Sequence, residues 1–94
     1  MNLQLSGKTA LVTGASVGIG RGIAKALAAE GVRVAVSARR VDKLKELADE
    51  IVAAGGHAPV IIESDLYVED AAKRLADAAL AGLGSVDILV NNAG

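Results

Sequence analysis

Four short apolar runs alternate along this chain with three stretches in which apolar residues recur at helical spacing. The runs cover residues 9–13, 32–37, 59–64 and 86–90, and the helical stretches cover 19–30, the segment from Asp42 to Gly55, and about 69–83. Such alternation predicts parallel strands joined by right-handed crossovers, with helices on both faces of one sheet. We therefore expect an α/β fold with a doubly wound parallel sheet in three layers, α/β/α.

The sheet order follows from the same pattern. The doubly wound rule gives the order 3-2-1-4. Pro59 opens the third run, and a proline there is tolerated mainly on an edge strand, which agrees with that order. The fourth run, Val86 to Val90, is apolar like an interior strand, yet only four residues follow it. We expect residues 1–94 to be the N-terminal part of a single domain that continues beyond residue 94, or an edge that a partner covers.

Helix boundaries can also be predicted. Gly31 is expected to end the first helix and Gly55-Gly56 the second, and Asp42 is expected to be the N-cap of the second. In the third helix the predicted inward face consists of Ala72, Leu75, Ala76 and Ala79.

Composition excludes several classes of protein. Net charge is −1, so no basic field marks a nucleic-acid surface, and the absence of cysteine removes disulfide scaffolds and cysteine metal sites. No apolar run approaches the roughly 18 residues of a membrane span, and the N-terminus lacks a secretion signal. We expect a cytoplasmic protein with no metal site and no membrane contact.

Residues 13–20, Thr-Gly-Ala-Ser-Val-Gly-Ile-Gly, stand between the first predicted strand and the first predicted helix. Glycines there let the backbone turn tightly, and the unpaired N–H groups of the helix N-terminus attract an anion. The spacing G-x3-G-x-G differs from the general dinucleotide pattern G-x-G-x-x-G. This segment predicts a phosphate cradle, and the alternative is a plain glycine turn.

The second predicted strand ends in Ser37-Ala38-Arg39-Arg40. An acid here would bind a ribose 2′-hydroxyl, whereas arginine suits a 2′-phosphate. The missing acid favours a phosphorylated dinucleotide and argues against a methyltransferase. The alternative is a pair of solvated arginines.

Polar residues also follow the third and fourth strands. Asp65 could accept a hydrogen bond from an adenine amino group, or it could be a simple turn aspartate. Asn91-Asn92-Ala93-Gly94 could bridge strands and let a ribose approach, or it could be an ordinary loop.

Together these residues resemble the classical short-chain dehydrogenase/reductase family, in its 3-oxoacyl-acyl-carrier-protein reductase-like subgroup. Residues 13–20 match the family motif TGxxxGxG, residues 91–94 match NNAG, and Asp65-Leu66 matches the adenine-contacting pair. The resemblance implies the N-terminal half of a Rossmann-type NAD(P)(H)-dependent oxidoreductase, which transfers hydride between NADPH and a carbonyl or alcohol. It also implies a homodimer or homotetramer.

The resemblance assigns coenzyme contacts to eleven positions. The pyrophosphate would lie on Gly14, Gly18, Ile19 and Gly20, the phosphorylated ribose on Ser16 and Arg39, the adenine on Asp65 and Leu66, and the riboses beside Asn91, Ala93 and Gly94. Val17 departs from the basic residue of many NADP-dependent members. We still expect NADP(H), with NAD(H) as the alternative.

No catalytic residue is assigned, because the serine and the Tyr-x-x-x-Lys pair of the family follow NNAG. The alternative function is a catalytically inert half-Rossmann fragment that binds nucleotide weakly or self-associates through its open strand edge.

Overall fold

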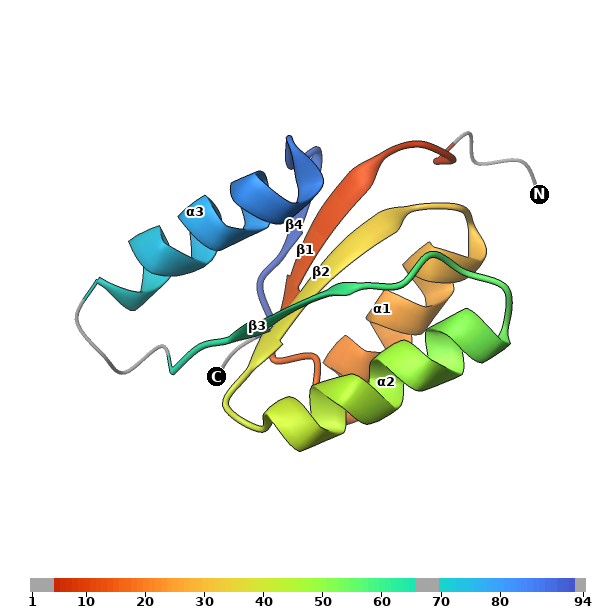
Figure 1. Cartoon of the computed structure of the whole chain (residues 1–94), viewed down its shortest axis with the longest axis horizontal. Helices are drawn as coiled ribbons and strands as arrows, with labels where there is room; N and C mark the ends of the chain where they lie inside the picture. Colours follow the sequence, from red (N-terminus) through yellow and green to blue (C-terminus); the bar gives the residue numbers. More distant parts are fainter. Residues whose placement is uncertain (1–4, 66–69, 93–94) are drawn as a thin grey trace.

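The computed structural model describes residues 5–65 and 70–92. Their elements follow in the order β1 (Thr9–Thr13), α1 (Gly18–Ala29), β2 (Arg33–Ala38), α2 (Val41–Ala53), β3 (Val60–Glu63), α3 (Ala71–Leu83) and β4 (Ile88–Val90). Within these residues the strands form one parallel sheet in the order β3-β2-β1-β4 (Figure 1). The predicted order and the edge position of the strand after Pro59 are confirmed.

Strand register brings the carboxyl ends of the strands to one edge of the sheet. Thr13 of β1 is level with Ser37 of β2, Val12 is level with Val90 of β4, and Ala38 is level with Glu63 of β3. The segments that follow the four strands therefore start at the same edge.

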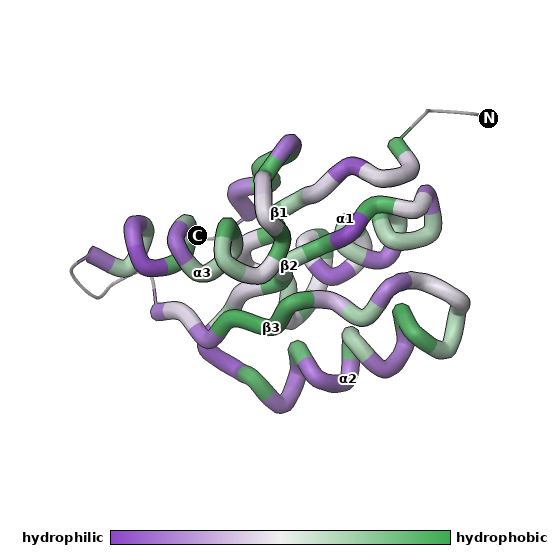
Figure 2. Tube along the Cα trace, turned by 45° about the horizontal axis from the view of Figure 1, so that its top comes forward, coloured by the Kyte–Doolittle hydropathy of each residue, from purple (hydrophilic) through white to green (hydrophobic). Residues whose placement is uncertain are grey.

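The sheet carries helices on both faces, as predicted for three layers. Helices α1 and α2 lie on one face and α3 on the other (Figure 1). Hydrophilic and hydrophobic residues alternate along α2 in the manner of a helix with one exposed face (Figure 2). The larger core cluster lies under α1 and α2 and includes Val12, Val34, Val36, Leu44, Leu47 and Ile51; the cluster under α3 comprises Leu11, Ala35, Leu75, Ala79 and Leu83.

Gly31 ends α1 as predicted. Its φ is +85°, its N–H donates to Ala28 O, and the next N–H, of Val32, donates to Leu27 O. This pair of bonds is a Schellman motif, which satisfies carbonyls that the helix end leaves open. The motif turns the chain directly into β2.

One prediction about the helices is wrong, and another is right for Leu75 and Ala79 only. Asp42 is not the N-cap: α2 begins at Val41, Arg40 occupies the N-cap position, and the Asp42 carboxylate instead binds the Arg40 guanidinium. In α3 the residues Ala72 and Ala76 are exposed. The buried row is Ala71, Leu75, Ala79 and Leu83, because these positions four apart place both leucines against the sheet.

Candidate coenzyme-binding site

The glycine segment connects β1 to α1 at the carboxyl edge of the sheet. Gly14 and Gly18 have φ of +61° and +62°, the left-handed region that favours glycine. Between them Ala15 is buried, and its N–H donates to Ser37 O at 3.1 Å. The segment therefore turns twice on its glycines and is tied at its centre to the end of β2.

Helix α1 starts with its N-terminal N–H groups facing this turn. Val17 is the N-cap residue and makes no side-chain cap hydrogen bond, and the first turn contains no acidic residue. The Ile19 side chain is 74% exposed, and Ser16 is half-buried. An anion at this position would meet backbone donors and the positive end of the helix dipole. The local geometry therefore fits a phosphate group.

Close packing around Gly20 leaves no room for a side chain. A Cβ at this position would lie 2.3 Å from Gly14 O and 2.6 Å from Asn92 Nδ2. The absence of a side chain lets α1 approach both the glycine segment and the end of β4. The expected contact of Gly20 with a pyrophosphate stays a prediction.

Thr13 joins the glycine segment to the residues after β4. The Asn92 N–H donates to Thr13 Oγ1 at 2.9 Å, and the Thr13 hydroxyl lies 3.2 Å from Asn91 Oδ1 and 3.3 Å from Val90 O, both acceptors. Asn92 Nδ2 donates to Gly14 O at 3.4 Å. The predicted bridging of strands by the asparagine pair is confirmed. Sequence reasoning missed the role of Thr13, because a threonine in an apolar run is typical of a buried strand.

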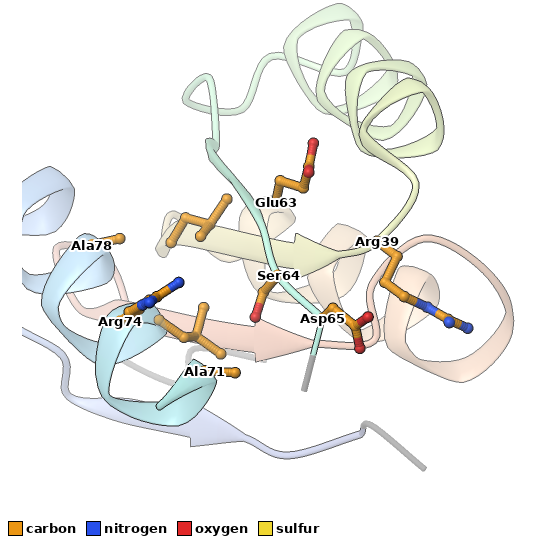
Figure 3. A pocket seen from close by; sticks show the side chains of 9 residues that line it. Arg39, Glu63, Ser64, Asp65, Ala71, Arg74 and Ala78 are labelled. Atoms are coloured by element: carbon orange, nitrogen blue, oxygen red, sulfur yellow. The ribbon is translucent and has the colours of Figure 1, made fainter. Parts of the chain in front are cut away.

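A pocket of about 540 Å³ opens beside the ends of β2 and β3. Figure 3 shows Arg39 and Asp65 toward one end of it and Arg74 of α3 toward the other. Ile62 and Leu75 contribute apolar side chains to its lining. The predicted adenosine residues Arg39 and Asp65 are thus brought to one pocket, whose lining combines a cation, an acid and apolar surface. Arg74 was missed because it reads as part of a solvated helix face.

Arg40, the residue after Arg39, pairs with Asp42. Its Nε donates to Asp42 Oδ1 at 2.9 Å and its Nη2 donates to Asp42 Oδ2 at 2.7 Å. This hydrogen-bonded pair raises the pKa of Arg40 and lowers the pKa of Asp42 to about 2. Both groups are therefore charged at neutral pH.

The structure brings most of the predicted coenzyme residues to one edge of the sheet. They are Gly14, Ser16, Gly18, Ile19, Gly20, Arg39, Asp65 and Asn91. The remaining three predicted residues, Leu66, Ala93 and Gly94, lie outside the described residues. In the ranges 5–65 and 70–92, no group of three or more His, Cys, Asp or Glu could hold a metal ion, and no helix is long and apolar enough to cross a membrane.

Comparison with known proteins identifies the family. The family described as short chain dehydrogenase matches residues 8–94, so the chain belongs to the short chain dehydrogenase family. A short chain dehydrogenase of Pseudocercospora fijiensis is 54% identical over 97% of this chain and 29% of the relative. The 7alpha-hydroxysteroid dehydrogenase of Escherichia coli K12 is 46% identical over 99% of this chain and 36% of the relative. The chain thus spans about a third of the length of these curated relatives.

Solved structures agree with this family and with the predicted Rossmann-type fold. A metagenomic short-chain oxidoreductase in complex with NADP is 50% identical with a TM-score of 0.89, covering 96% of this chain and 40% of that one. A 7 alpha-hydroxysteroid dehydrogenase complexed with NADH and 7-oxo glycochenodeoxycholic acid is 45% identical with a TM-score of 0.92, covering 99% of this chain and 36% of that one. Nicotinamide dinucleotides of both kinds are therefore bound by proteins similar to this chain.

Proposed function

We propose that this chain supplies the coenzyme-binding half of an NAD(P)(H)-dependent oxidoreductase that transfers hydride between NADPH and a carbonyl or alcohol substrate. The observation that carries the proposal is the convergence at one sheet edge of the α1 N-terminus with Arg39, Asp65 and Asn91, in a member of the short chain dehydrogenase family. The match over residues 8–94 does not favour an inert fragment that self-associates.

The pyrophosphate, the adenine and the riboses of a dinucleotide each have a matching group in the chain. The N–H groups at the start of α1, which lack a side-chain cap, suit the pyrophosphate. Asp65 and the apolar lining of the pocket suit the adenine. Asn91, oriented by Thr13, follows β4 at the same edge of the sheet and suits the riboses. When bound, the nicotinamide ring supplies or accepts the hydride. The residues of this chain bind and orient that coenzyme.

The preference for NADP(H) depends on the end of β2. Ala38 is half-buried and offers no carboxylate to a ribose 2′-hydroxyl, and the next residue, Arg39, is exposed beside the pocket. A guanidinium binds a phosphate through charge-assisted, bidentate hydrogen bonds. NAD(H) is the second candidate, since a similar structure contains NADH.

Finer assignments are part of the same proposal. We infer membership of the 3-oxoacyl-acyl-carrier-protein reductase-like subgroup, assembly as a homodimer or homotetramer, and a cytoplasmic location. We also infer that the domain continues beyond residue 94 and that the groups for proton transfer follow Asn91-Asn92-Ala93-Gly94. No catalytic residue is proposed among residues 1–94.

The test is a fluorescence titration of the purified protein with NADPH and NADH. Arg39→Ala should weaken NADPH binding by about 10- to 100-fold, the value of a hydrogen bond to a charged group, and leave NADH binding unchanged. Arg33→Ala is the matched control, because Arg33 is exposed at the opposite end of β2. Equal binding of NADPH and NADH by the wild type, or an unchanged ratio in Arg39→Ala, would refute the NADPH preference. Binding of neither coenzyme would refute the proposed function.

A further inference from the structure

Arg40 and Asp42 form an ion pair in the connection between β2 and α2. The pair has two parallel hydrogen bonds, of 2.9 and 2.7 Å, which is the fork geometry that guanidinium and carboxylate prefer. Both side chains are exposed, at 65% and 60%, so the pair is held by its own geometry and not by burial.

The backbone supports this pairing. Arg40 is the N-cap residue of α2 and Asp42 lies in the first turn of that helix, where the helix dipole stabilises a carboxylate. Only Val41 separates the two residues, so little chain entropy is lost when the side chains meet. The same pairing lowers the pKa of the Asp42 carboxyl to about 2, so the carboxylate stays ionised further into acid than an ordinary aspartate.

The adjacent residues Arg39 and Arg40 lie in different surroundings. Arg39 contributes to the wall of the pocket that also contains Asp65. Arg40 directs its Nε and Nη2 donors to both oxygens of Asp42, and its charge is balanced there. A 2′-phosphate at the end of β2 would therefore meet an Arg40 guanidinium whose charge Asp42 already balances.

We propose that Asp42 is a specificity-determining residue that holds Arg40 in this pair and so limits the preference for the 2′-phosphorylated coenzyme. The inference rests on the proposed function and adds to it a residue that moderates the coenzyme ratio. Asp42→Ala releases Arg40, which is then available to the 2′-phosphate.

The experiment compares NADPH and NADH dissociation constants for four variants of the purified protein at low and high salt. In Asp42→Ala the preference for NADPH should rise about three- to tenfold, through NADPH alone, and this gain should shrink as salt screens the exposed charges. Asp49→Ala, the same change on an exposed residue of the same helix, should leave the ratio unchanged. Arg40→Ala should also leave the ratio unchanged, because Arg40 is already neutralised. The double variant Arg40→Ala/Asp42→Ala should show no gain.

The NADPH and NADH dissociation constants of a variant are measured on one preparation. A loss of folded protein therefore affects both measurements equally and leaves their ratio unchanged. An unchanged ratio in Asp42→Ala would overturn the inference. A gain that persists in the double variant would also overturn it, since Asp42 would then act by its own charge and not through Arg40. A loss of NADPH binding in Arg40→Ala would show that Arg40 already contacts the phosphate. This result would contradict the proposal that Asp42 holds Arg40 in the ion pair. If the wild type bound neither coenzyme, the proposed function would fail first, and this inference with it.

Discussion

The carboxylate of Asp87 accepts hydrogen bonds from both the backbone N–H and the hydroxyl of Thr9, at 3.0 and 3.1 Å, across 78 positions of sequence. In return the Asp87 N–H donates to Thr9 O and Thr9 Oγ1, each at 3.1 Å. These bonds fix the start of β1 beside the chain that enters β4. They lie at the amino edge of the sheet, opposite the coenzyme site.

Asp87→Ala should lower the melting temperature at pH 7, because it leaves the Thr9 N–H without its acceptor. The Thr9 hydrogen bonds hold the pKa of Asp87 below its usual range. A lowered folded-state pKa means that the stabilisation is present above about pH 4, the usual carboxyl pKa, and is lost as pH falls through the lowered value. Thermal denaturation between pH 2.5 and 7 should therefore show the two proteins converging in acid. Asp77→Ala on the exposed side of α3 is the control, and equal melting temperatures for Asp87→Ala and wild type at pH 7 would contradict the role.

Gly20 and Gly22 form a matched pair for alanine substitution within α1. Gly20→Ala should destabilise the fold by about 1–3 kcal/mol, because its Cβ would overlap the carbonyl of Gly14. Gly22→Ala should stabilise it by about 0.5–1 kcal/mol, since a Cβ there meets nothing within 4 Å and alanine reduces the entropy of the unfolded chain. Urea unfolding followed by circular dichroism measures both. The same sign for the two substitutions would disprove this packing account.

Thr13→Val removes the hydroxyl from a buried position and keeps the branched shape. We expect a loss of about 1–3 kcal/mol in the free energy of unfolding, because the Asn92 N–H loses its acceptor and Asn91 Oδ1 loses its donor. Coenzyme binding should weaken as well, since Asn91 is no longer oriented. Thr13→Ser restores the hydroxyl and should retain binding. If titration showed full affinity in Thr13→Val, Thr13 would have no part in positioning Asn91.

Arg40→Ala should raise the pKa of Asp42 from about 2 toward its usual value near 4, because the main cause of the shift is the Arg40 hydrogen bond. The stabilisation from this pair is present above about pH 4 and is lost as pH falls through about 2. Carboxyl-carbon NMR across pH 1.5–6 measures the titration directly. A midpoint that does not move in the variant would mean that the pair is not formed in solution.

The fold could be predicted because several patterns in the sequence agree. Continuous apolar runs predicted buried parallel strands, and Pro59 independently predicted the edge position of β3. The face of α3 could not be predicted as well. Alanines fill many of its positions, so apolarity alone does not separate Ala72 and Ala76 from Ala71 and Ala79. The leucines Leu75 and Leu83 determine which row is buried.

The sequence predicted where the residues of the site lie better than it predicted which side chains contact one another. Glycines before a helix and polar residues after strands indicate where a ligand would bind, and the register brings them to one edge. Side-chain pairing depends on rotamers that no periodicity encodes. Asp42 therefore read as a helix cap although it binds Arg40, and Thr13 read as a strand residue although it orients the asparagines.

The bond from Ala15 N–H to Ser37 O has a consequence for protein engineering. It anchors the glycine segment to β2 through a main-chain carbonyl that every residue type carries, one position before Ala38. Residues 38–42 can therefore be exchanged as a cassette to redirect coenzyme choice while the anchor of the glycine segment is kept. Replacement of Ala15 by proline would remove the N–H donor of that anchor and should detach the glycine segment from the end of β2.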